Sequence, residues 1–200
     1  MLLSFFTSPK TCEAGLDEAG RGCLAGPVVA GAVVLPKDYK SEVLDDSKKI
    51  TEKKRDFLRI EIEREAISYG VGFVWQEEID EINILNASFL AMHRAVDLLE
   101  VTPELLLVDG NRFNPYKAIP HECIIKGDGK YLSIAAASIL AKTYRDEYMT
   151  NLSEKFPEYG WDSNAGYPTK KHRAAIKEFG STEHHRHSFT LLPRQIDLFT

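Results

Sequence analysis

The sequence predicts a single α/β domain with a central sheet and helices on both faces. A chain of 200 residues suffices for one domain with a sizeable core. Strand-like and helix-like segments alternate along it, without internal repeats or low-complexity tracts. Hydrophobic residues make up 44% and charged residues 28%, which is ordinary for a globular protein. We therefore expect one catalytic unit over residues 1–200, with residues 150–200 as a helical C-terminal segment.

Five segments have the composition of strands. Residues 14–17 approach the first acidic pair, and the β-branched run 28–35 suits a buried strand that pairs with them as a hairpin. Residues 67–75 return to a strand pattern. The wholly apolar run 105–108 ends on Asp-Gly, and residues 121–126 lead into Gly-Asp-Gly.

Three segments have the pattern of helices. Residues 52–65 carry Phe57, Leu58, Ile60 and Ile62 as a candidate core face. Residues 82–100 carry apolar side chains at spacings of three or four, as an amphipathic helix does. The alanine-rich run 134–141 predicts a helix whose small side chains let it lie close against the sheet.

Charge and cysteine usage narrow the class of protein. A net charge of −5 argues against a general nucleic-acid coat, because nonspecific affinity for a duplex comes mostly from Lys and Arg. From Trp161 onward, however, the chain has six Lys or Arg residues and only four acidic residues. This part is therefore either a basic binding face or a solvated charged helix. Three scattered cysteines without a CxxC pair favour a reducing cytoplasm. The lack of a long apolar stretch suggests no membrane role.

Asp17 and Glu18 form the most informative pair of residues. Neighbouring side chains on a strand point to opposite faces, so both acids serve one site only where the strand ends or bulges. Gly20 and Gly22 on either side of Arg21 allow such an ending and leave backbone amides uncovered. The segment therefore predicts a hard-metal site beside a surface that a sugar-phosphate chain can approach.

Two further acids follow strand-like runs. Asp109 stands at the expected C-terminal edge of a strand, where ligand sites form in α/β sheets, but Asp-Gly is also a turn signal. Asp128 follows another strand and is equally compatible with a helix-capping acid. Each acid has a purely structural alternative when it is considered by itself.

Together, the motifs and their order resemble the ribonuclease HII family, also called type 2 ribonuclease H, from about residue 15 to residue 189. This resemblance implies a ribonuclease H-like fold with a mixed five-stranded sheet and a helical C-terminal extension. The motifs that carry it are Asp17-Glu18-Ala19-Gly20-Arg21-Gly22, Asp46-Ser47-Lys48-Lys49, Val108-Asp109-Gly110, Lys126-Gly127-Asp128, Ala136-Ala137-Ser138-Ile139-Leu140-Ala141-Lys142 with Arg145-Asp146, and Gly166-Tyr167-Pro168-Thr169-Lys170.

The resemblance also implies roles for individual residues. The four acids Asp17, Glu18, Asp109 and Asp128 match the metal site of the family. Gly20, Arg21 and Gly22 match the element that recognises the 2′-hydroxyl where RNA meets DNA, and Tyr167 matches a tyrosine that stacks on the following deoxyribose. Lys48 and the segment 138–142 are expected to contact the nucleic-acid backbone or to support the site.

The implied activity is endonucleolytic cleavage of RNA in RNA–DNA hybrids and at single ribonucleotides in duplex DNA, as in ribonucleotide excision repair. Two Mg²⁺ or Mn²⁺ ions held by carboxylates can activate water and stabilise the leaving oxygen, which predicts 3′-hydroxyl and 5′-phosphate ends. The alternatives are a ribonuclease HIII-like enzyme, a noncatalytic hybrid-binding module and another nuclease of the same fold. The short lead before the first motif favours HII over HIII, and the four acids disfavour a noncatalytic module.

The C-terminal region raises two further questions. His184, His185 and His187 are expected to lie in a polar surface loop rather than to bind metal, with His185 and Arg186 helping to pack or to bind substrate. The apolar tail 191–200 is either a packing segment or a peptide that binds a DNA-replication or repair partner. We expect a monomer.

Overall fold

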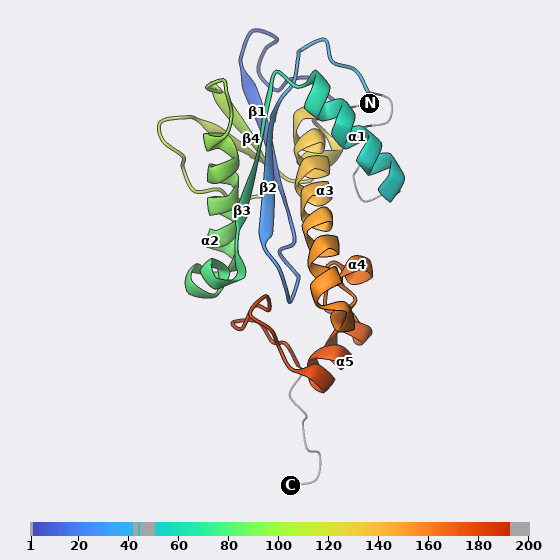
Figure 1. Cartoon of the computed structure of the whole chain (residues 1–200). Coiled ribbons are helices and arrows are strands. Elements are labelled where there is room, and N and C mark those ends of the chain that lie inside the picture. The colour runs from blue at the N-terminus through green and yellow to red at the C-terminus, as the bar shows by residue number, and fades with distance from the viewer. Residues whose placement is uncertain (1, 42–43, 45–50, 193–200) are drawn as a thin grey trace.

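A central five-stranded sheet organises the computed structural model, which describes residues 2–41, 44 and 51–192 (Figure 1). Its strand order is β3-β2-β1-β4-β5. β1 pairs antiparallel with β2 and parallel with β4, so the predicted hairpin and mixed sheet are both confirmed. The strands are β1 (Glu13–Ala19), β2 (Val28–Val34), β3 (Ser68–Val74), β4 (Leu105–Asp109) and β5 (His121–Ile124).

Helices cover both faces of this sheet, as expected. α2 (Gln76–Asp97) lies on one face, and α1 (Glu52–Glu65) and α3 (Leu132–Lys155) lie on the other (Figure 1). Among the described residues, no helix is long and apolar enough to cross a membrane.

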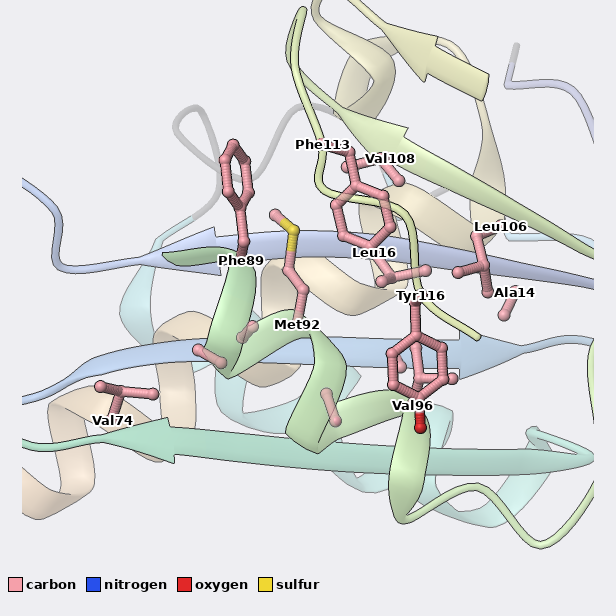
Figure 2. Packing of buried hydrophobic residues seen from close by; sticks show 14 of the residues in the cluster. Ala14, Leu16, Val74, Phe89, Met92, Val96, Leu106, Val108, Phe113 and Tyr116 are labelled. Carbon is pink, nitrogen blue, oxygen red and sulfur yellow. The ribbon is translucent and has the colours of Figure 1, made fainter. Parts of the chain in front are cut away.

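Alternating side chains of β1 fill two different layers. Ala14 and Leu16 pack with Phe89 and Met92 of α2 in one core, which Figure 2 shows from close by. Gly15, between them, faces α3. The period of two along the strand therefore separates the two layers.

α3 lies unusually close to the sheet because glycines of the sheet face it. A Cβ atom added to Gly15 would stand 2.2 Å from the carbonyl carbon of Ser133, and one added to Gly31 would stand 2.4 Å from the carbonyl oxygen of Ala137. Any side chain at either position would displace the helix. The sequence predicted this close contact from the small residues of the helix alone.

α1 and α2 differ in detail from the prediction. In α1 only Leu58 and Ile62, four residues apart, are buried, and the expected core residues Phe57 and Ile60 are exposed. α2 begins six residues earlier than expected. Asn83 interrupts it with a φ of 65°, and its side chain accepts hydrogen bonds from the backbone at 85 and 86, so the apolar periodicity marks only the second half.

The C-terminal region is helical and returns to the sheet. It comprises η3 (Pro157–Tyr159), α4 (Trp161–Asn164) and α5 (Lys170–Phe179), which share a core with Leu24 and Ala25 of the β1–β2 connection. Residue 185 pairs with residue 25, and the next segment binds Asp80 of α2 through the backbone amides of His187 and Ser188. The C-terminal region thus packs directly under the Gly-Arg-Gly loop.

Candidate active site

A pocket of about 530 Å³ opens at the C-terminal ends of β1 and β4. Three of the four predicted acids line it, together with the Gly-Arg-Gly loop and three side chains from α1 and α3. Its lining comprises Asp17, Glu18, Ala19, Gly20, Arg21, Gly22, Arg55, Asp109, Ser138, Lys142 and Tyr167.

Asp17 is buried on the α3 side of β1. Its carboxylate accepts hydrogen bonds from the Ser138 side chain and from the backbone N–H of Glu18, the latter at 2.7 Å. Burial first, and then the negative charges of Glu18 and Asp109, raise the pKa of Asp17 well above its ordinary value. The pocket therefore holds carboxylates close together in a buried place, where water screens their negative charges poorly.

Glu18 lies beside Asp17 although strand alternation should separate the two. β1 ends at Ala19, and the pocket opens at that end, so both carboxylates reach it. Burial raises the pKa of Glu18, and the guanidinium of Arg21 at 3.0 Å opposes the rise. Arg21 itself remains about half exposed, because its side chain extends toward the open pocket.

Asp109 ends β4 and faces the acidic pair. Its carboxylate accepts a 2.6 Å hydrogen bond from the backbone N–H of Gly127, which fixes it against η2 (Gly127–Gly129). Asp128 is the next residue of this turn and is buried, but it is not among the residues that line the pocket. Within the described part of the chain, no three Asp, Glu, His or Cys side chains form a ready-made cage for an ion.

Two buried arginines hold the Gly-Arg-Gly loop from below. Arg145 of α3 donates hydrogen bonds to the carbonyl oxygens of residues 27, 165 and 25 at 2.9, 2.8 and 3.1 Å. Arg186 donates to the carbonyl oxygens of Gly26 and Arg21 at 2.9 and 3.0 Å. Gly20, with a φ of 93°, lies so close that an added Cβ would stand 2.1 Å from Nε of Arg145. Arg186 therefore bonds the loop itself, while Arg145 packs against Gly20 and bonds the residues that follow the loop.

Tyr167 forms the rim of the pocket opposite the acids. The residue is 40% exposed, its ring lies 5.9 Å from Nζ of Lys142, and its hydroxyl faces the buried Cys23. An aromatic ring that belonged to the core would be covered on both faces. This ring instead offers an open surface beside positive charge, as a stacking side chain does.

Comparison with known proteins identifies the chain. The family model described as ribonuclease HII matches residues 14–192, a range that contains the pocket and both buried arginines. The chain belongs to the ribonuclease HII family. It is accordingly an endoribonuclease that acts on RNA–DNA hybrids.

Named relatives are similar over nearly their full lengths. The ribonuclease HII of Bacteroides thetaiotaomicron is 69% identical over 96% of both chains. That of Christiangramia forsetii is 63% identical over 98% of this chain and 99% of its own.

Solved structures of the family share the fold. The ribonuclease H2 of Pyrococcus horikoshii OT3 superposes with a TM-score of 0.74 at 28% identity, covering 90% of this chain and 94% of its own. Ribonuclease HII of Archaeoglobus fulgidus, solved in a complex with PCNA, gives 0.73 at 27%, covering 94% and 98%. Bst-RNase HIII, solved with Mn²⁺, gives 0.70 at 17% over 90% of this chain and 68% of its own, a likeness of fold alone.

The structure brings together most of the predicted site and adds residues that sequence reasoning missed. Lys48 lies outside the described residues. Arg55 was considered only as part of a core helix, yet it lines the pocket. Its position, seven residues after Lys48 in a cation-rich segment, was the available signal.

The expectation of a polar surface loop is wrong for His185, whereas the expectation that His185 and Arg186 help to pack the C-terminal region agrees with their burial. This side chain and that of Arg186 are completely buried, while His187 is exposed. Three ring contacts, with Tyr159, Trp161 and His172, explain the burial of His185. Nothing in the local sequence distinguished it from its neighbours, because its partners lie 13 to 26 residues away.

Proposed function

We propose that this enzyme cuts the RNA strand of hybrids and also cuts at single ribonucleotides embedded in duplex DNA, by two-metal-ion catalysis that leaves 3′-hydroxyl and 5′-phosphate ends. The observation that carries the proposal is the pocket itself. It places three carboxylates within one cavity with a glycine-flanked arginine and an open aromatic ring. Residues 150–200 are proposed as the helical segment that completes the substrate surface of a single catalytic domain.

The donor set of the pocket fits hard divalent cations. Its acidic members offer only oxygen ligands, which Mg²⁺ and Mn²⁺ prefer. Asp17 and Glu18 both have raised pKa values, chiefly through burial, and Asp109 adds like charge to each, so a divalent cation would relieve an existing electrostatic penalty. We propose Asp17, Glu18, Asp109 and Asp128 as the ligands. Such ions supply positive charge at the scissile phosphate and activate water.

The side chains of the pocket have distinct proposed tasks in that reaction. The hydroxyl of Ser138 holds Asp17 toward α3, and the amide of Gly127 holds Asp109, so both carboxylates are oriented before substrate arrives. Lys142 and Arg55 line the same pocket as the acids and place positive charge where a phosphate would enter. Lys48 is proposed as a further contact to the nucleic-acid backbone.

Recognition of ribose is assigned to Gly20, Arg21 and Gly22. A 2′-hydroxyl is the group that distinguishes RNA from DNA, and recognising it requires polar atoms close to the sugar. No atom lies within 4 Å of the place where a Cβ of Gly22 would stand, so the backbone there is open to a close ligand. Tyr167 then stacks on the next sugar, and its open ring face supports that role.

A cleavage assay on defined duplexes tests the proposal directly. One substrate carries a single ribonucleotide in duplex DNA, the second is all DNA and the third is a long hybrid, each assayed with Mg²⁺, with Mn²⁺ and with chelator. We expect metal-dependent cutting of the first and third only. Equal cutting of the all-DNA duplex would reject ribose recognition and favour another nuclease of this fold. Binding of hybrids without any cutting would favour a noncatalytic module.

The PCNA complex of the Archaeoglobus fulgidus relative supports a proposal about partners. We propose that this enzyme acts as a cytoplasmic monomer and contacts a DNA-replication or repair protein through the tail 191–200. That tail is mostly outside the described residues. A chain truncated after Leu192 should cut naked duplex at the rate of the full chain while losing the contact.

A further inference from the structure

Two buried histidines outside the pocket connect the C-terminal region to Tyr167. His172 stands in the first turn of α5 and His185 in the segment that returns to the sheet, and both are completely buried. Their Nε2 atoms lie 3.2 Å apart. The roles proposed above use neither ring.

The hydrogen bonds around the pair determine which nitrogen carries each proton. The indole N–H of Trp161 donates to Nε2 of His172 at 3.0 Å, so this nitrogen is an acceptor and the proton is on Nδ1. Nδ1 of His172 lies 2.9 Å from the carbonyl oxygen of Tyr167 and therefore donates to it. The backbone N–H of Thr182 donates to Nδ1 of His185, which leaves the proton of His185 on Nε2. That N–H points at Nε2 of His172 from 3.2 Å and shares its single lone pair with the indole of Trp161, whose contact is the shorter.

Both rings are neutral at physiological pH. Burial lowers the pKa of His172, and burial first, then the cost of charging both neighbouring rings together, lowers the pKa of His185 to about 4. A directed chain of donors thus runs from Thr182 through His185 and His172 to the backbone of Tyr167. The same carbonyl also accepts the N–H of Thr169, and the N–H of Tyr167 donates to the carbonyl of Asn164.

The ring of Tyr167 needs this backbone anchor because 40% of the residue is exposed. The turn that precedes it is strained at Ala165, which has a φ of 45°, whereas Gly166 adopts its φ of 79° at no steric cost. We propose that His172 is a positioning residue for cleavage, which as the Nδ1–H tautomer holds the Tyr167 backbone and so sets the ring that stacks on substrate, and that His185 maintains that tautomer. This inference rests on the proposed stacking role of Tyr167.

Two substitutions of His172 separate positioning from simple packing. The amide nitrogen of Asn stands where Nδ1 stands, so His172→Asn keeps a donor to the Tyr167 carbonyl. The end of a Gln side chain reaches the place of Nε2 instead, so His172→Gln keeps a polar neighbour for Trp161 and loses that donor. A matched control is His93→Gln on α2, across the sheet from α3, which makes the same substitution at an imidazole whose Nε2 lies 3.0 Å from the carbonyl oxygen of Asn114.

The readout is steady-state cleavage of the single-ribonucleotide duplex, at a temperature where circular dichroism shows every variant folded. Loss of one hydrogen bond predicts that His172→Gln lowers kcat/KM about three- to ten-fold, mainly through KM. His172→Asn should restore kcat/KM to within about two-fold of the native value, and His93→Gln should not change it. Equal losses for Asn and Gln would overturn the proposal.

A double-mutant cycle with Tyr167→Ala decides between the remaining outcomes. If His172 acts through Tyr167, His172→Gln adds no loss once the ring is gone. A loss that persists without the ring would overturn the positioning role. If His172→Gln has the native kcat/KM and Tyr167→Ala has a lowered kcat/KM, only this inference is rejected. If Tyr167→Ala also has the native kcat/KM, the stacking role of Tyr167 is rejected as well.

A spectroscopic measurement on the native chain remains decisive if His172→Gln does not fold. Long-range ¹H–¹⁵N correlations distinguish the two neutral tautomers of histidine and the charged form. We expect His172 to show a protonated Nδ1 and a bare Nε2, and His185 to show the opposite tautomer. A His172 ring that is charged, or that carries its proton on Nε2, could not donate and accept as the structure requires and would refute the proposal.

Discussion

Replacing Arg145 should severely destabilise this protein, chiefly because buried carbonyls lose their donors. Met at this position keeps most of the apolar stem and removes the guanidinium, which is 1% exposed and donates to three backbone carbonyls at 2.8–3.1 Å. Each carbonyl that loses a charged donor in a buried place costs about 1–2 kcal/mol, so Arg145→Met should lower the free energy of unfolding by about 3–6 kcal/mol. That is a large part of the free energy of unfolding of a typical domain, which is about 5–15 kcal/mol.

Urea unfolding followed by circular dichroism measures this loss. Arg59→Met is the matched control, because Arg59 is partly exposed and pairs with Glu63 and Glu147 at the surface of α1 and α3. Surface ion pairs contribute about 0–1 kcal/mol each, so the control should lose about 1 kcal/mol. Arg145→Lys, with one compact donor group, should fall between native and Met. Similar losses for Arg145→Met and Arg59→Met would refute the argument that buried guanidinium bonds fix the loop.

Four other predictions concern the site and its surroundings. Asp109→Asn should lower kcat by two orders of magnitude or more, about 3 kcal/mol of barrier, and still bind hybrid with near-native Kd, because an amide oxygen can also accept from Gly127; retained turnover would remove Asp109 from the metal site. Tyr167→Ala should weaken cleavage about 5- to 100-fold through lost stacking while changing the melting temperature little; a large drop in Tm would indicate a core role instead. Saturating Mg²⁺ at about 100 times its Kd should stabilise the native chain by about 2.7 kcal/mol, seen as a higher Tm that chelator reverses and that Asp17→Asn reduces. The lowered pKa of His185 predicts that its contribution to stability is fully present above pH 6.5 and lost as pH falls toward 4, by at most about 3 kcal/mol; His185→Gln should flatten this part of the unfolding profile, and an unchanged profile would contradict a buried neutral ring.

The strands and most helices could be predicted because their signals are local. The apolar run 28–35 and the alanine-rich run 134–141 needed only composition and spacing to become β2 and the N-terminal half of α3. The start of α2 could not be predicted in this way. Its first half has few apolar side chains at helical spacing, and it is stabilised by an ion pair between Glu78 and Arg94, 16 residues further along the chain.

The acidic side of the pocket was predictable for a different reason. Asp17 and Asp109 each stand at the C-terminal end of a strand, and parallel pairing of β1 with β4 brings such ends to the same edge. The supporting contacts were not predictable. Arg145 reaches carbonyls about 120 residues earlier in the chain, and His172 reaches His185 across a turn, so only the tertiary fold reveals either set.

Contacts between residues far apart in the sequence hold the loop that carries Arg21 and the residue Tyr167 in one rigid site. The loop that carries Arg21 has few contacts of its own, since Gly20 has no side chain and Gly22 is exposed. Arg186 supplies part of its rigidity by donating to the carbonyl of Arg21, and the neighbouring His185 acts on Tyr167 through His172. One C-terminal segment therefore supports both the loop that carries Arg21 and the backbone of Tyr167 at the substrate pocket. Because both depend on it, unfolding of that segment should abolish ribose recognition and stacking together, while the carboxylates on β1 and β4 keep their places in the sheet.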